Sequence, residues 1–150
     1  MQEPELAYPF QSIRAVLDAR NQLHPHKIAL HDLDQDKAAS YAELHITANR
    51  IANFLESLGM GKGDRVALLA DECLEKLLIW MGIWRLGAVV CPLNIEIDAN
   101  HIQELLLNIE PKLTLWHRDI DGAALTKGVG GKVMRFDGWD PEYGGDPGTG

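Results

Sequence analysis

Three short apolar segments, separated by helical patterns, constrain the fold of this chain more than any other feature of its sequence. The segments cover residues 64–70, 88–93 and 113–117. Between them, apolar residues recur at helical spacing over residues 72–86 and 98–110. Strands that alternate with helices form right-handed βαβ crossovers, which build a mostly parallel sheet with helices on both faces. The sequence therefore predicts an α/β, doubly wound fold.

Helix-capping residues mark where the helices begin and end. Ser40 and Glu43 form a capping box at the start of a helix that Gly59 ends. Side chains are also predicted to cap the other helices, namely Ser12, Asp71 and Asp98. A short strand over residues 27–32 and a turn over residues 34–36 are expected before the capping box.

The carboxyl-terminal part of the sequence has a weaker pattern. Residues 123–127 are expected to form a short helix and residues 132–136 a strand. The segment from residue 138 to residue 150 is rich in glycine and proline, so it is predicted to be a linker or a truncated end. Residues 1–137 are predicted to form one α/β domain.

Composition excludes several classes of partner. The net charge is −8 and the acidic residues are spread along the chain, which argues against nucleic acid or an anionic membrane surface. The longest apolar stretch, residues 77–84, is too short for a transmembrane helix. Cys73 and Cys91 lie in apolar runs, and residues 1–7 lack the apolar core of a signal peptide. We therefore expect a cytoplasmic protein.

No motif in the sequence alone predicts a catalytic residue or a metal ligand. The glycine-rich segments at residues 59–63 and 128–133 each precede a strand, whereas a phosphate-binding loop leads into a helix. His24, His26 and His31 lack a cysteine or acidic partner at a zinc-binding spacing. Both classes of site are therefore predicted to be absent from this chain.

Four segments, in order, resemble the adenylate-forming superfamily of acyl-CoA synthetases, luciferases and peptide-synthetase adenylation domains. They cover about residues 25–118. The segments are Lys27–Leu30 leading to Ser40–Leu44, the junction Leu58–Ala67, the strand Leu86–Asn94, and the region around Pro111–Leu113. The ending Pro92-Leu93-Asn94 is similar to that of acyl-CoA and aryl-CoA ligases, whereas peptide-synthetase domains more often carry aspartate at the last position.

The resemblance implies an acid–CoA ligase and the amino-terminal subdomain of its fold. Such ligases use ATP and magnesium to form an acyl-adenylate, and then transfer the acyl group to CoA. The loop that binds ATP, rich in serine, threonine and glycine, and the catalytic lysine of the family have no match within residues 1–150. The chain alone is therefore expected to catalyse no adenylation, so the full-length enzyme would be needed to bind a carboxylic acid substrate.

Asn94 is the one candidate for a cofactor contact. It follows a predicted strand, and the carboxyl ends of strands border the ligand crevice in α/β sheets. Some relatives place a basic residue near the CoA phosphates just after this asparagine. This chain has Glu96 there, which would repel phosphate, so a structural role for Asn94 in a turn is favoured.

Two kinds of partner and two other functions stay open at this point. The helix at residues 72–86 is apolar all round, so it is expected to pack against the rest of a ligase or, if part of it is exposed, to cause self-association and binding of hydrophobic dyes. The chain could instead be an autonomous binding or regulatory module. A receiver-like or flavodoxin-like domain using Asp32 and Asp71 ranks last.

Overall fold

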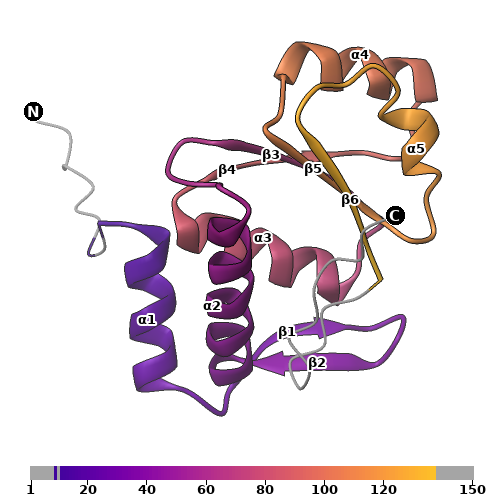
Figure 1. Cartoon of the computed structure of the whole chain (residues 1–150). Helices are drawn as coiled ribbons and strands as arrows, with labels where there is room; N and C mark the ends of the chain where they lie inside the picture. Colours follow the sequence, from indigo (N-terminus) through magenta and orange to yellow (C-terminus); the bar gives the residue numbers. More distant parts are fainter. Residues whose placement is uncertain (1–8, 10, 138–150) are drawn as a thin grey trace, which may run out of the picture.

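Four parallel strands form the central sheet of the protein (Figure 1), in the computed structural model, which describes residue 9 and residues 11–137. Their spatial order is β4-β3-β5-β6. The strands are β3 (Arg65–Leu69), β4 (Val89–Leu93), β5 (Leu113–His117) and β6 (Lys132–Phe136). All four were predicted from the sequence, and the parallel sheet is confirmed. The predicted linker at residues 138–150 lies outside the described residues.

Helices cover both faces of this sheet, as predicted (Figure 1). On one face lie α1 (Ile13–Leu23), α2 (Tyr41–Ser57) and α3 (Leu74–Leu86), and on the other lie α4 (Ala99–Ile109) and the short α5 (Gly122–Leu125). Alternate strand residues point to opposite faces, so Val66 and Leu68 pack towards α2 and α3, whereas Ala67 and Leu69 pack towards α4. The hydrophobic core is thereby divided in two by the sheet.

A small hairpin lies apart from the parallel sheet. It pairs β1 (Ile28–Asp32) with β2 (Lys37–Ser40) in antiparallel register. β2 was not predicted, because its sequence Lys-Ala-Ala-Ser lacks the β-branched and aromatic residues that mark strands. This segment forms a strand because its backbone pairs with β1.

Most of the predicted caps are confirmed. The Ser12 hydroxyl accepts a hydrogen bond from Ala15 N, and both hydrogen bonds of the Ser40–Glu43 capping box are formed. Asp98 accepts from the first amides of α4. Gly87 ends α3 in the left-handed conformation at φ +82°, which glycine adopts without steric cost.

The predicted cap of α3 by Asp71 is wrong. The helix begins three residues later, at Leu74, and the residue before it, Cys73, makes no capping hydrogen bond through its side chain. Leu74 N instead donates to the Asp32 carboxylate at 3.3 Å, from the end of β1. Asp32, which is distant in the sequence, therefore caps the start of α3 in place of Asp71.

Helix α3 lies between other elements along its whole length. Every residue from Leu74 to Leu86 is buried or half-buried, and the half-buried ones include Leu77, Trp80 and Trp84. Its contact with α2 is so close that a Cβ added to Gly82 would overlap the side chain of Ile51. Self-association through α3 stays a prediction. None of the helices in the described part of the chain is long and apolar enough to cross a bilayer.

Candidate functional site: two clefts at the start of α3

A cleft of about 440 Å³ opens at the carboxyl ends of β3 and β4. The residues that follow the two strands form its walls, and α3 contributes Lys76 and Trp80. The other lining residues are Ala70, Asp71 and Glu72 after β3, Pro92 and Leu93 at the end of β4, and Asn94, Ile95 and Glu96 after it. Parallel α/β sheets bind their ligands at this position, just beyond the carboxyl ends of the strands.

Lys76 is the most unusual side chain of this cleft. It is 5% exposed, although lysine is seldom fully buried without a partner. Its Nζ donates to Glu72 Oε1 at 2.6 Å, and the Glu72 side chain is 83% exposed. The lysine is therefore held in place by a carboxylate that itself remains in water.

Asn94 lies on the wall of the same cleft, where its side chain serves the backbone. Its Oδ1 accepts a hydrogen bond from Glu96 N at 2.9 Å, which closes a turn directly after β4. The favoured structural role is confirmed. A contact between Asn94 and a cofactor stays a prediction.

The charges around the cleft do not fit the phosphates of ATP or CoA. Lys76 is the one cation among the residues that line it, and Glu72 already neutralises that charge. The carboxylates of Asp71 and Glu96 add negative charge to the same walls. A polyphosphate would meet net repulsion there, because like charges at close range disfavour each other.

The acidic side chains of residues 11–137 are scattered rather than clustered. Within this range, no group of three or more histidine, cysteine, aspartate or glutamate side chains lies close enough together to hold a metal ion. Magnesium takes its protein ligands from carboxylates and other oxygens.

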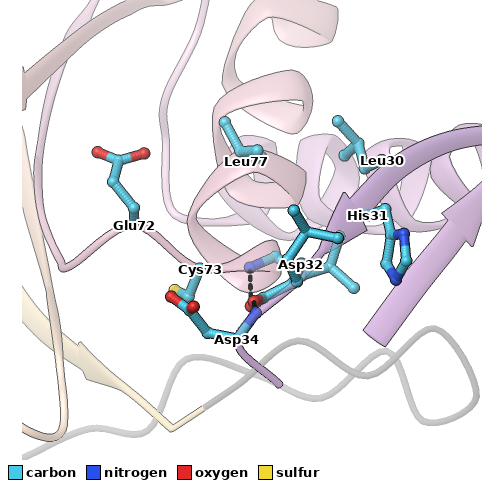
Figure 2. A pocket seen from close by; sticks show the side chains of 9 residues that line it. Leu30, His31, Asp32, Asp34, Glu72, Cys73 and Leu77 are labelled. Atoms are coloured by element: carbon cyan, nitrogen blue, oxygen red, sulfur yellow. Dashed lines mark hydrogen bonds between the residues drawn. The ribbon is translucent and has the colours of Figure 1, made fainter. Parts of the chain in front are cut away.

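A second pocket, of about 320 Å³, lies between the hairpin and the start of α3. Figure 2 shows the side chains of Asp32, Cys73 and Leu77 around it. Leucines form most of its apolar wall, namely Leu30, Leu33, Leu74 and Leu77. Glu72 lines both this pocket and the cleft, so the segment before α3 separates the two.

The Asp32 carboxylate accepts three backbone hydrogen bonds beside this pocket. Besides Leu74 N, it accepts from Asp34 N at 3.1 Å and from Gln35 N at 3.2 Å. Asp71 lines the other cleft, so the structure does not bring the two aspartates into one acidic site. The receiver-like reading, which needs such a cluster, is therefore not supported.

Cys73 borders the same pocket but is poorly suited to act as a nucleophile. Burial away from water raises the pKa of its thiol, and the nearby Glu75 charge acts in the same direction. Burial raises the pKa of Cys91 as well. Since the thiolate is the reactive form, both cysteines are expected to stay protonated and unreactive near neutral pH.

Sequence reasoning missed Lys76 and Glu72. The one available signal was a lysine inside an otherwise apolar helix, four residues after a glutamate, which is the spacing of a helical ion pair. Because such lysines usually lie on solvent-exposed faces, the pattern alone does not predict that this one is buried.

This chain is similar to proteins of one family and to solved structures of longer proteins. The family model described as AMP-binding enzyme matches residues 17–142. The crotonobetaine/carnitine–CoA ligase of Salmonella paratyphi A is 40% identical over 74 residues, which are 49% of this chain and 14% of that protein. The match therefore spans only a small part of the curated relative's length.

Solved structures agree with this placement. The N-terminal domain of FACL13 from Mycobacterium tuberculosis has 26% sequence identity and a TM-score of 0.74, and the match covers 84% of this chain and 34% of that one. ATP-bound MatB from Rhodopseudomonas palustris has 30% identity and a TM-score of 0.70, over 82% of this chain and 24% of that one. In each case the matched part is an amino-terminal portion of the longer protein.

Proposed function

Because this chain belongs to the AMP-binding enzyme family, we propose that it forms the amino-terminal part of an ATP-dependent carboxylic acid–CoA ligase. The observation that carries the proposal is the family match over residues 17–142. The whole enzyme would join a carboxylic acid to AMP, releasing pyrophosphate from ATP. It would then transfer the acyl group from AMP to the thiol of CoA, releasing AMP.

Two observations favour CoA as the acyl acceptor. The curated relative at 40% identity is a CoA ligase. The strand β4 also ends in Pro92-Leu93-Asn94, the ending that resembles acyl-CoA and aryl-CoA ligases. The name of the relative makes a small betaine-type acid, such as crotonobetaine or carnitine, the first substrate to test.

The role we propose for the chain itself is architectural. Its described residues build a covered parallel sheet, and the cleft at the ends of the strands has the wrong charge for a polyphosphate. We therefore assign the binding of ATP, magnesium and CoA to the remainder of the enzyme. The chain alone is proposed to catalyse no adenylation. The enzyme is proposed to lie in the cytoplasm.

The test begins with the coding DNA beyond the codon for Gly150. We expect an open reading frame that soon encodes a loop rich in serine, threonine and glycine with a lysine. The chain of residues 1–150 and the extended protein would then be assayed for acid-dependent exchange between ATP and pyrophosphate, with carnitine, crotonobetaine and simple fatty and aromatic acids.

We expect exchange from the extended protein and none from residues 1–150. Exchange by the short chain would overturn the proposal that it is inactive. A stop codon directly after Gly150 would overturn the fragment proposal and leave an autonomous binding module, for which pull-down experiments would be the next step.

A further inference from the structure

Helix α1 buries little of its own surface against the rest of the domain. It lies beside α2 at the margin of the molecule (Figure 1), and Leu17 is the one buried side chain among its 11 residues. Helix α2, by comparison, buries side chains along its whole length. Elements with few buried apolar contacts open locally before the rest of a protein unfolds. The burial of α1 therefore predicts a helix that opens easily unless a polar contact holds it in place.

The aspartate next to Leu17 supplies such a contact. Asp18 Oδ1 lies 2.8 Å from Arg85 Nη1, in the last turn of α3, and 3.5 Å from His45 Nδ1 of α2. These three atoms are shielded from water, and within the described residues none of them makes an aligned hydrogen bond. The attraction between Asp18 and Arg85 is therefore one of opposite charges, and it joins α1 to α3.

Arg85 depends on this carboxylate. Its side chain is 8% exposed, and arginine is almost never fully buried unless it is paired. Removal of one partner from a buried ion pair is strongly destabilising, because the other charge then has neither water nor a counter-ion. Opening of α1 would relieve that cost by letting water reach the guanidinium group. Loss of the Asp18 charge should therefore open α1 rather than unfold the whole domain.

Hydrogen bonds on α2 hold the partners of Asp18 in position. Arg85 Nε donates to Asn49 Oδ1, since a guanidinium group has no acceptor. The Asn49 amide nitrogen then faces His45 Nε2 at 3.2 Å, so Nε2 accepts and the neutral imidazole carries its proton on Nδ1, towards Asp18. Arg85 and His45 thus both direct donors at one carboxylate.

We propose that α1 is a latch: it opens and closes as one unit on α2 and α3, and recognition of the Asp18 carboxylate by Arg85 and His45 sets how often it is open. The turn at residues 24–27, between α1 and β1, is the hinge. The open state exposes part of the core cluster to which Leu17 belongs. The inference goes beyond the proposed function and does not depend on it.

Native-state hydrogen exchange on residues 1–150 tests the proposal. The amides of Arg20 and Asn21 report the opening of α1, and those of Ile51 and Leu55 report the opening of α2. We expect protection factors at least about 10-fold lower in α1 than in α2, and a further fall of at least about 10-fold in α1 alone for Asp18→Asn. Equal protection of the two helices in the parent, or an equal fall in both for the variant, would overturn the inference.

A carboxylate on another helix provides the matched control. Glu104 of α4 has a side chain that is 74% exposed, and Glu104→Gln removes its charge. The protection of α1 should be the same in this variant as in the parent. A fall as large as that of Asp18→Asn would mean that α1 responds to the overall charge of the chain, which would refute a specific role for Asp18.

Reversal of the ion pair separates charge recognition from loss of packing. Asp18→Arg and Arg85→Asp each bring like charges together, so each variant should lower the protection of α1. The double variant restores opposite charges across the same two helices, and we expect it to regain at least about 10-fold in protection relative to Asp18→Arg. A double variant no better protected than Asp18→Arg would contradict the proposed role of the pair. If circular dichroism shows that Arg85→Asp does not fold, the comparison of Asp18→Asn with the parent decides.

Discussion

The face of the sheet beneath α2 and α3 and the face beneath α4 and α5 differ in how completely they are buried. On the α2/α3 face, Val66, Leu68, Leu113 and Leu115 of the inner strands are 0% exposed, and Met134 and Phe136 of the outer strand β6 are 8% and 0% exposed. On the α4/α5 face, Ala67 and Leu69 are equally buried at the centre, but Val89 is 46% exposed and Val133 is 38% exposed on the outer strands. On the α2/α3 face, the helices of this chain bury the strand side chains out to β6. On the α4/α5 face, they bury only the side chains of the inner strands.

A matched pair of leucine substitutions gives the largest expected effect and tests this difference directly. Leu78 of α3 and Leu106 of α4 are both 0% exposed. We expect Leu78→Ala to lower the free energy of unfolding by about 4–5 kcal/mol and Leu106→Ala by about 2–3 kcal/mol. The loss at Leu106 is smaller because its neighbours on the less buried α4/α5 face can relax into the cavity. Urea denaturation of both variants measures this, and equal losses would show that the two faces are equally tightly packed.

The cap of α3 gives the next effect and sharpens the account of the α2/α3 face. Asp32→Ala removes the acceptor of Leu74 N and of two amides of the hairpin turn, so we expect a loss of about 1–2 kcal/mol, as for other capping residues. The matched control is Asp71→Ala, whose side chain is exposed and does not cap the helix. Thermal unfolding should place the control within about 0.5 kcal/mol of the parent. A larger loss for Asp71→Ala would reinstate the predicted local cap.

The smallest effect concerns an ion pair that belongs to neither face, before the amino end of β3. Lys112 Nζ donates to the Asp64 carboxylate at 3.1 Å, and this bond, with a second from Gly61 N, lowers the pKa of Asp64 below its ordinary value of 3.8. The deprotonated form is favoured by folding, so the contribution is present above that ordinary value and is lost as the pH falls through the lower folded-state pKa.

We therefore expect Asp64→Asn to reduce the loss of stability as the pH falls. At neutral pH, the variant should lose only the small contribution of the ion pair. Chemical denaturation at a series of pH values, from neutral down through the acid limb, checks this. An acid limb identical to that of the parent would mean that Asp64 does not contribute to it.

Local patterns predicted most of the fold, because most of its signals act within a few residues. The Ser40–Glu43 box, the glycine at the end of α3 and the strands of the sheet depend on neighbours in sequence, and each is found where expected. The cap of α3 depends on a contact between residues 42 positions apart in the sequence, and it was missed. Strand β2 was missed for another reason: it forms by pairing with β1, and its own residue types do not mark it as a strand.

The candidate site was predictable only as a location. Asn94 marked the carboxyl end of β4, and the cleft is there. The charge of the cleft was predicted only in part. Glu96 was expected to repel phosphate, but the ion pair of the buried Lys76 with Glu72 was not predicted. Burial of a lysine is decided by what packs over its aliphatic stem, and that depends on tertiary structure.

The hydrogen bond from Leu74 N to Asp32 also has a consequence for the order in which the chain folds. A helix has a costly nucleus, and the first turn of α3 finds this acceptor only after a segment 42 residues earlier has closed its hairpin. During synthesis the hairpin leaves the ribosome first, so its acceptor is ready when α3 emerges. The hairpin and the first turn of α3 should therefore open together as one cooperative unit in native-state exchange.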